Sequence, residues 1–268
     1  MLKNVDYHII DRCNLNCAGC NDFSPLVSPD DKGKSIEQIT ADFMLLSKIK
    51  NEFYILNIMG GEPTLHPELS KILRIARQIF PDNKIRLLTN GTNYDKFYRW
   101  KDAIVENKID VVVSVYPYCP DYQERYDKLA SILRPEVEID EYWTAAVTDG
   151  FNRATFSNQY GVANEEDIQS CTRRFACPQL KNGKIYLCPF AAQFDKLKTY
   201  FGDKITFDYD GKEYLDLNGD VTPKDFYDFI YGARPLMCNH CVGAHNKWLG
   251  PKHQWETTKK SLDEWVSE

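Results

Sequence analysis

The chain has 268 residues, with 33 Lys and Arg against 39 Asp and Glu, and 43% of its residues are hydrophobic. This length suits one large domain, or one domain with a small appendage, and allows a proper hydrophobic core. No block of Lys and Arg indicates nucleic-acid binding, and no apolar run approaches a membrane span. The N-terminal residues MLKNVDYHIIDRC also lack the long apolar stretch of a signal peptide. We therefore expect a cytoplasmic protein with neither a nucleic-acid nor a membrane partner.

The first half of the chain alternates predicted strands with predicted helices. Runs of buried or β-branched residues predict strands at 5–10, 53–59, 84–90, 109–116 and 137–143. Helical spacing predicts helices at 35–50, 67–80, 93–107 and 120–134. Ser35 is the expected N-cap of the first helix, with Gln38 at the capping-box position, and Pro67 is expected in the first turn of the second.

This alternation indicates parallel βαβ units. Segments whose residues could bind a ligand or take part in catalysis follow the strands: a cysteine loop, GGEP, TNGT and SVYP. Barrel enzymes carry their chemistry at the C-terminal ends of the strands, so this arrangement favours a β/α barrel over an open sheet. The periodicity alone does not give the number of strands in the barrel.

Beyond residue 143 the pattern changes. Residues 144–170 are polar and irregular, and the stretches after them predict a short strand at KIYLC, a helix over 222–233 and a last amphipathic helix over 257–268. We expect residues 1–143 to form the core of a partial barrel. Residues 144–268 are expected to complete the barrel and to hold a small cysteine-rich region.

Three of the nine cysteines, Cys13, Cys17 and Cys20, form a C-x3-C-x2-C group near the N-terminus. In a chain without a secretory signal, clustered cysteines favour metal binding or catalysis over disulfides. A cubic iron–sulfur cluster has four ligand positions, so three thiolates leave one iron open for a small molecule. A structural zinc is the alternative, but it needs a fourth Cys or His, and none follows Cys20 until His66.

The spacing of these three cysteines resembles that of the radical S-adenosylmethionine (SAM) superfamily. The resemblance implies a partial (β/α)6 TIM-like barrel and a [4Fe–4S] cluster whose open iron binds the amino and carboxylate groups of SAM. It also implies an electron donor such as flavodoxin or ferredoxin. Reductive cleavage of SAM then gives a 5′-deoxyadenosyl radical, which removes a hydrogen atom from a substrate.

Further segments fit this resemblance. Gly60, Gly61 and Glu62 follow the second predicted strand and resemble the GGE motif, whose backbone and glutamate hold the SAM amino group. Asn90, within TNGT, corresponds to a position near the SAM ribose or carboxylate, and Ser114 resembles a ribose-contacting position. An ordinary strand-to-helix turn and a helix cap are the alternatives for the first two segments.

The chain departs from the family at one position. Radical SAM enzymes usually have an aromatic residue just before the third cysteine, packed against the adenine, and Gly19 stands there in this chain. Phe23 is a candidate for the missing aromatic face, and core packing is its alternative role.

A second group of cysteines follows Cys171, with eleven residues before Gly183 and four more before Cys188. With a later C-x2-C, this spacing resembles the first half of the SPASM pattern, whose shortened form is called twitch and holds one auxiliary [4Fe–4S] cluster. The ligands implied by the resemblance are Cys171, Cys188, Cys238 and Cys241. Cys177 is the rival of Cys171, although only five residues separate it from Gly183. A four-cysteine zinc ribbon is the alternative.

Cys119 stands apart from both groups, just after the fourth predicted strand. At that edge of a barrel a thiol is a candidate donor of a hydrogen atom to a substrate radical. A small apolar filler is its alternative role.

These features lead us to expect an enzyme that dehydrogenates or epimerises a small polar substrate, such as a sugar, an aminocyclitol or a nucleotide-linked sugar. The chain begins about a dozen residues before Cys13, without the N-terminal peptide-binding domain of many peptide-modifying relatives. Maturation of a peptide or ribosomal peptide is the second hypothesis. A non-catalytic module with structural zinc at both cysteine groups is a third, from a different class, but it has no use for GGEP.

Overall fold

The structure is a computed structural model that describes residues 2–116, 119–137, 139–143, 155–171, 173–207, 213–242 and 255–267. All five strands and all four helices predicted in the first half are present. They are β1 (Leu2–Ile10), α1 (Ile36–Leu46), β2 (Phe53–Gly60), α2 (Leu69–Ile79), β3 (Lys84–Thr89), α3 (Lys101–Glu106), β4 (Ile109–Val115), α4 (Tyr122–Leu133) and β5 (Ile139–Trp143). The third predicted helix is split, because a 3-10 helix (Tyr94–Arg99) precedes α3.

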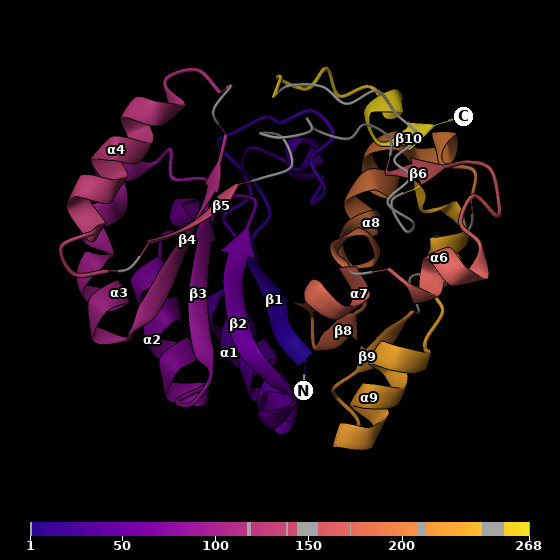
Figure 1. Ribbon diagram of the computed structural model, residues 1–268, viewed down its shortest axis with the longest axis horizontal. Coiled ribbons are helices and arrows are strands. Elements are labelled where there is room, and N and C mark those ends of the chain that lie inside the picture. Colours follow the sequence, from indigo (N-terminus) through magenta and orange to yellow (C-terminus); the bar gives the residue numbers. More distant parts are fainter. Residues whose placement is uncertain are drawn as a thin grey trace.

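Strands from both halves of the chain form one eight-stranded sheet. Its order is β5-β4-β3-β2-β1-β7-β8-β9, in which β7 is Gln179–Lys181, β8 is Lys184–Tyr186 and β9 is Tyr214–Asp216. The strands from β5 to β7 are parallel to their neighbours, whereas β8 and β9 are antiparallel. Six parallel strands agree with the expected partial barrel. The sixth, β7, lies beside β1, so the second half of the chain extends the sheet at its first strand (Figure 1).

The main core lies between this sheet and its helices. Leu69, Ile72, Leu73 and Ala76 of α2 are fully buried, and their i, i+3, i+4, i+7 spacing places them on one face of the helix. Full burial of each of the larger side chains stabilises the fold by about 1.5–3 kcal/mol. Figure 1 shows α2, α3 and α4 together on the outer side of the strands.

A second core forms around α8 (Pro189–Phe201), a helix that the sequence pattern did not predict. Phe190 and Phe194 of this helix pack on Phe156 at ring-centroid distances of 5.7 and 5.8 Å. Phe156 belongs to β6 (Phe156–Ser157), which pairs in parallel with β10 (Val266–Ser267). The remaining helices of this half are α6 (Glu165–Gln169), α7 (Arg173–Ala176) and α9 (Pro223–Gly232), the last of which was predicted.

Three sequence-based expectations are corrected. The final residues form a 3-10 turn (Leu262–Glu264) and then β10, because Trp265 is buried in the second core and Val266 pairs with β6. Ser35 does cap α1, but the Gln38 side chain bonds to Asn182 and completes no capping box. Helix α2 begins at Leu69, after Pro67 and the N-cap residue.

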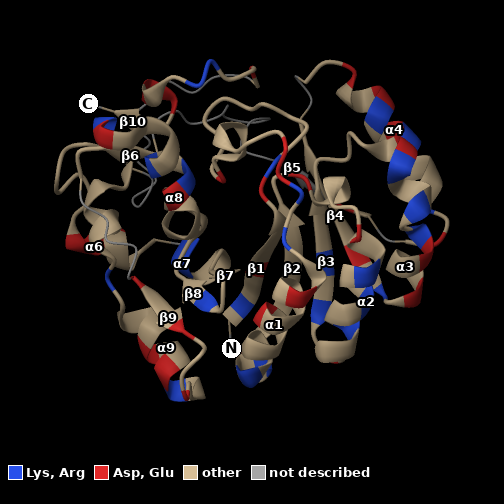
Figure 2. Ribbon diagram, turned by 180° about the vertical axis from the view of Figure 1, so that it is seen from behind, with Lys and Arg blue, Asp and Glu red and all other residues tan. Residues whose placement is uncertain are grey.

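Charge is mixed over the molecule. Figure 2 shows Lys and Arg interspersed with Asp and Glu along α4, where Lys128 pairs with Glu124. Among the described residues, no helix is long and apolar enough to cross a membrane.

Candidate functional site

A cavity lies at the C-terminal ends of β1, β2, β3 and β4. Most of the residues that the sequence assigned to the first site line it. These are Cys13, Cys17, Cys20, Gly60, Gly61, Asn90 and Ser114. They come from four separate segments of the chain, which the parallel sheet brings to one edge. Asp22, which no motif indicated, and Tyr116, the third residue of SVYP, also line the cavity.

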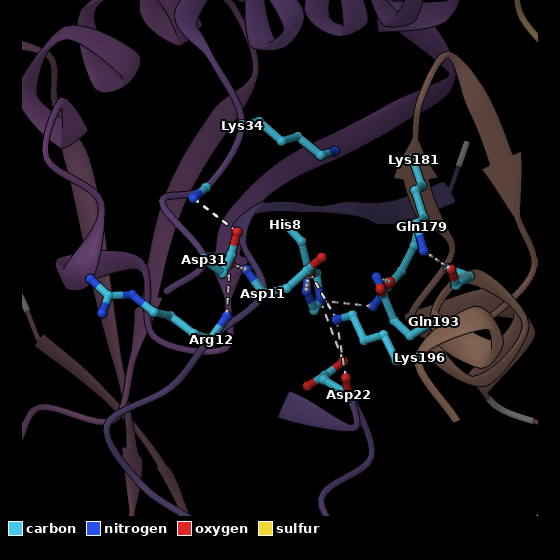
Figure 3. A network of polar contacts seen from close by, with 12 residues as sticks. His8, Asp11, Arg12, Asp22, Asp31, Lys34, Gln179, Lys181, Gln193 and Lys196 are labelled. Carbon is cyan, nitrogen blue, oxygen red and sulfur yellow. Dashed lines mark hydrogen bonds and ion pairs between the residues drawn. The ribbon is translucent and has the colours of Figure 1, made fainter. Parts of the chain in front are cut away.

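The cysteine loop is fixed by hydrogen bonds to its backbone and to its sulfur atoms. The Asp31 carboxylate accepts from the backbone N–H groups of Asp11 (2.9 Å) and Arg12 (3.1 Å), at the entrance to the loop (Figure 3). The Cys13 sulfur accepts from the backbone N–H of Leu15 at 3.4 Å. The loop is therefore held in shape by the protein itself.

Burial raises the pKa of all three thiols in the loop. For Cys17 the pKa rises to about 12, with desolvation as the main cause and the neighbouring Cys20 as the second. The pKa of Cys13 also lies well above its ordinary value, for the same main cause, and that of Cys20 is raised. Because metal ligands must be thiolates, metal binding here releases protons.

Three thiols that line one cavity fit a sulfur-ligated iron cluster better than an oxygen-ligated ion, since soft thiolates select iron–sulfur clusters and zinc. Within the described ranges, no three Cys, His, Asp or Glu side chains are spaced to hold a single metal ion. His66, the first His after the cysteine loop, has both ring nitrogens engaged. Its Nε2 lies 2.9 Å from the Lys34 carbonyl oxygen, and its Nδ1 accepts from the Glu68 backbone N–H at 3.1 Å.

Gly60 and Gly61 lie directly against the start of the cysteine loop. The Gly61 N–H donates to the Ile10 carbonyl (2.9 Å) and the Glu62 N–H donates to the Arg12 carbonyl (3.0 Å). A Cβ on either glycine would lie closer to these carbonyl groups than real Cβ atoms ever approach. Glycine is thus required by the contact between GGEP and the cysteine loop, in addition to leaving room on the cavity side.

The Glu62 carboxylate is completely buried and does not line the cavity. Its Oε1 accepts from the hydroxyls of Thr64 (2.5 Å) and Thr89 (2.7 Å), and its Oε2 accepts from the Asn90 N–H (2.8 Å). Burial raises its pKa, and these hydrogen bonds oppose the rise. The side chain therefore connects GGEP to TNGT, a role that the motif alone did not indicate.

Asn90 reaches from TNGT to the cysteine loop. Its Nδ2 donates to Asn14 Oδ1 at 2.9 Å and lies 3.6 Å from the Cys13 sulfur. Its Oδ1 accepts from the Thr92 hydroxyl at 2.6 Å. Ser114 lies across the cavity on β4, and its carbonyl accepts from the Tyr122 hydroxyl at 2.7 Å.

The two remaining candidates of the first half lie in cores. Phe23 is fully buried in the second core, with its ring 6.4 Å from Phe156 and 6.5 Å from Phe190, and it does not line the cavity. Core packing is thus the role that the structure favours for Phe23, and Tyr116 is the aromatic residue on the cavity wall. Cys119 is buried in the main core and is also not among the residues that line the cavity.

A second cavity lies in the other half of the chain. Its walls carry the four cysteines of the resemblance, Cys171, Cys188, Cys238 and Cys241. Burial raises the pKa of Cys188 to about 11. Cys177 does not line this cavity. The structure therefore brings Cys171, rather than Cys177, together with the other three cysteines.

A buried charged network joins the two halves of the chain (Figure 3). His8 of β1 lies 3.3 Å from Asp22 and 3.5 Å from Asp11, while Lys196 of α8 lies 2.8 Å from Asp11. Although burial favours the neutral form of Asp22, the His8 charge and hydrogen bond lower its pKa below the ordinary value. No motif indicated this network, because Lys196 lies more than 170 residues from His8, Asp11 and Asp22 in the sequence.

Amide side chains continue the network on the same side of β1. Gln179 of β7 lies 3.4 Å from His8 Nε2, and its Oε1 accepts from Gln193 of α8 at 2.8 Å. Asp6, two residues before His8 on β1, accepts from Asn57 at 2.7 Å. The junction of β1, β7 and α8 is therefore polar, between two apolar cores.

Comparison with known proteins agrees with this geometry. The sequence profile of the radical SAM superfamily matches residues 7–140. A GTP 3′,8-cyclase of Microcystis aeruginosa (strain NIES-843 / IAM M-2473) is 30% identical over 101 residues, which are 34% of this chain and 29% of that protein. The match thus covers less than a third of that relative's length.

A solved structure shares the fold. The crystal structure of BtrN in complex with AdoMet and 2-DOIA superposes with a TM-score of 0.52 and 14% identity, over 90% of this chain and 93% of that one. Streptococcus suis SuiB bound to S-adenosylmethionine gives a TM-score of 0.39 and 14% identity, over 87% of this chain and 67% of that one. Because the family profile spans half of the chain and its motif positions meet at one cavity, this protein belongs to the radical SAM superfamily, whose members use a [4Fe–4S] cluster and SAM.

Proposed function

We propose that the first cavity holds a [4Fe–4S] cluster through Cys13, Cys17 and Cys20, with SAM at the open iron. One observation carries the proposal: the three thiols share a cavity with the backbone of Gly60 and Gly61. When bound, the cluster and SAM supply a 5′-deoxyadenosyl radical that removes a hydrogen atom from a substrate. An electron donor of the flavodoxin or ferredoxin type would reduce the cluster.

The residues around the thiols would bind and orient SAM. The backbone of Gly60 and Gly61 is suited to its amino group, since no side chain intervenes. Asn90 and Ser114 offer polar groups for its carboxylate and ribose. Tyr116 is the aromatic candidate for the adenine face. Glu62 would act at one remove, by holding Asn90 in place.

We assign an auxiliary [4Fe–4S] cluster to the second cavity, with the ligands Cys171, Cys188, Cys238 and Cys241. The presence of all four in the lining of this cavity supports this assignment, as does the apolar lining by Phe156, Phe190 and Met237. Such a cluster would serve as a one-electron acceptor. The boundary near residue 143 then separates the SAM-binding part from the part that holds the auxiliary cluster.

The substrate class that we propose is a small polar molecule: a sugar, an aminocyclitol or a nucleotide-linked sugar. Oxidation of a CH–OH group to a carbonyl removes one hydrogen atom from carbon, one electron, and one proton from the hydroxyl. The radical chemistry of the family would remove the hydrogen atom, the auxiliary cluster would accept the electron, and the hydroxyl proton would pass to solvent. The fold shared with BtrN, solved with AdoMet and 2-DOIA, is compatible with this class.

Metal analysis tests the proposal directly. Iron, acid-labile sulfide and zinc should be measured after anaerobic reconstitution, in the wild type and in the Cys13/Cys17/Cys20→Ala triple variant. Two cubic clusters predict about eight irons, falling to about four in the variant. The wild type should also form 5′-deoxyadenosine from SAM and dithionite, and the triple variant should form none. Zinc in place of iron at the first site would contradict the proposal.

Epimerisation is the other reaction that we propose for the same substrate class. It returns a hydrogen atom to the substrate radical, so the product would carry deuterium from heavy water, whereas dehydrogenation would leave no such label. A peptide substrate is the alternative class. If the substrate is a peptide, a peptide together with a separate recognition protein should stimulate formation of 5′-deoxyadenosine, whereas sugars should not.

A further inference from the structure

The C-terminal segment, residues 255–266, lies against the N-terminal cysteine loop. The backbone N–H of Ala18 donates to the Glu256 carbonyl at 3.0 Å, and that of Thr258 donates to the Asn16 carbonyl at 2.8 Å. Cys17 forms an antiparallel bridge with Thr257 between these two bonds. The two parts are more than 230 residues apart in sequence, so no local motif connects them.

Within this segment, Trp255 contacts a proposed cluster ligand. Its indole Nε1–H donates to the Cys17 sulfur at a donor–acceptor distance of 3.0 Å. An indole N–H is a donor only, so the direction of this bond is fixed by chemistry. The ring is half-buried and packs against the main core, which sets its orientation.

The far end of the segment is anchored. Trp265 is fully buried in the second core, and its indole N–H donates to the Cys20 carbonyl at 2.9 Å. Glu264 caps the turn before it through the Ser261 N–H and hydroxyl, both at 3.2 Å. Val266 then pairs with Phe156 of β6. Both ends of the segment are therefore bound to the cysteine loop. The position of Trp255 thus depends on the anchoring of the whole segment as well as on its N–H···S bond to Cys17.

We propose that Trp255 is a positioning residue of the N-terminal cluster, whose N–H···S bond to Cys17 raises the reduction potential of that cluster. This inference rests on the proposed function, since it needs a cluster at Cys13, Cys17 and Cys20. Reduction adds one negative charge, which is spread over the iron and its thiolates. A donor to a ligand sulfur stabilises that charge, so it favours the reduced state.

Two substitutions isolate the N–H group. Trp255→Phe removes it together with part of the ring. Replacement of Trp255 by 3-benzothienylalanine, introduced at a reassigned codon, keeps the bicyclic shape and exchanges N–H for sulfur. Trp100→Phe is the matched control, because Trp100 is buried in the main core against Phe97 and does not line the cavity.

The readout is the midpoint potential of the N-terminal cluster in the full chain, from a redox titration followed by electron paramagnetic resonance. That cluster is identified as the one whose signal changes on addition of SAM. We expect both Trp255 variants to have a more negative midpoint, with the ratio of reduced to oxidised cluster at fixed potential falling about tenfold, or ~59 mV for one electron. Trp100→Phe should leave the midpoint unchanged.

Iron content separates the possible failures. If the wild type holds a SAM-responsive cluster and both Trp255 variants keep its iron and its midpoint, the role of Trp255 is wrong and the proposed function stands. If the benzothienylalanine variant keeps its iron and its midpoint potential becomes more negative, the inference is supported even where Trp255→Phe loses iron. If no SAM-responsive cluster forms in the wild type, both the proposed function and this inference are overturned.

Discussion

The hydroxyl of Thr89 donates a 2.7 Å hydrogen bond to the buried carboxylate of Glu62, and this bond joins the segments that follow β2 and β3. The same carboxylate accepts from the Asn90 N–H at 2.8 Å. Asn90 in turn reaches Asn14 in the cysteine loop. Three segments that line the first cavity are therefore fixed relative to one another through Asn90, which lines it, and Glu62, which does not.

Glu62→Gln should weaken SAM binding, although the side chain at this position does not line the cavity. If the amide oxygen keeps the bonds from Thr64 and Thr89, the amide NH2 faces the Asn90 N–H, and two donors oppose each other in a buried site. A buried donor left unpaired costs about 1–3 kcal/mol. We expect a comparable loss in the free energy of unfolding and a weaker affinity for SAM, measured by urea denaturation and by equilibrium dialysis. Glu68→Gln, at an exposed ion pair with Lys71, is the control and should change neither quantity.

The cavity walls predict which cysteine completes the second site. Cys171→Ala should remove about four irons per chain, because it deletes one of four converging thiols. Cys177→Ala should leave the iron content unchanged, because Cys177 does not line the cavity. Iron and sulfide analysis of the two variants, prepared in parallel under anaerobic conditions, checks this prediction. Loss of iron from the Cys177 variant alone would reverse the assignment.

The alternating half of the fold was predictable because local signals determine it. The runs that form β1 to β5 are apolar or β-branched, and each is followed by a segment with helical spacing. Helix α8 was missed because it is buried on several faces: Phe190, Gln193, Phe194 and Lys196 are all buried, so its sequence shows no clear apolar stripe. The end of the chain was misread for the opposite reason, since its amphipathic spacing is overridden by the pairing of β10 with β6.

The candidate site was predictable only where residue type and spacing carry chemistry. Cysteine spacing indicated both groups of thiols, and a double glycine indicated the close contact with the cysteine loop. The roles of Trp255 and Lys196 depend on contacts across more than 170 residues, which no local pattern encodes. Phe23 was a reasonable candidate by position alone, but its backbone turn directs its ring into the second core.

Asp6 should make the stability of the protein depend on pH. It is buried on β1, and desolvation, opposed by hydrogen bonds from Asn57 and Asn4, raises its pKa from 3.8 to about 6. A carboxyl whose folded-state pKa is raised stabilises the fold most below its unfolded-state pKa, and this contribution is lost as pH rises through the folded-state value. The wild type therefore carries a penalty of about 3 kcal/mol at pH 8.

Asp6→Asn should remove this penalty, because the amide oxygen can still accept from Asn57 and Asn4 but carries no charge. We expect the variant to be more stable than the wild type by about 2–3 kcal/mol at pH 8, with the difference shrinking between pH 6 and pH 4. Urea denaturation at several pH values measures it. Asp127→Asn, on the exposed face of α4, is the control and should show no such trend. A difference independent of pH would contradict the assigned cause.

Substitution of Cys119 distinguishes between its two candidate roles, a structural thiol and a donor of a hydrogen atom. Because it is buried in the main core and does not line the cavity, Cys119→Ala should cost about 1 kcal/mol of stability and leave formation of 5′-deoxyadenosine unchanged. If the enzyme is an epimerase, transfer of solvent deuterium to the product should also persist in this variant, since another donor would be used. Mass spectrometry of the product in heavy water, with Cys119→Ser as the second variant, decides the point. A variant that still consumes SAM but no longer labels the product would make Cys119 the donor and require the loop after β4 to move its thiol toward the cavity.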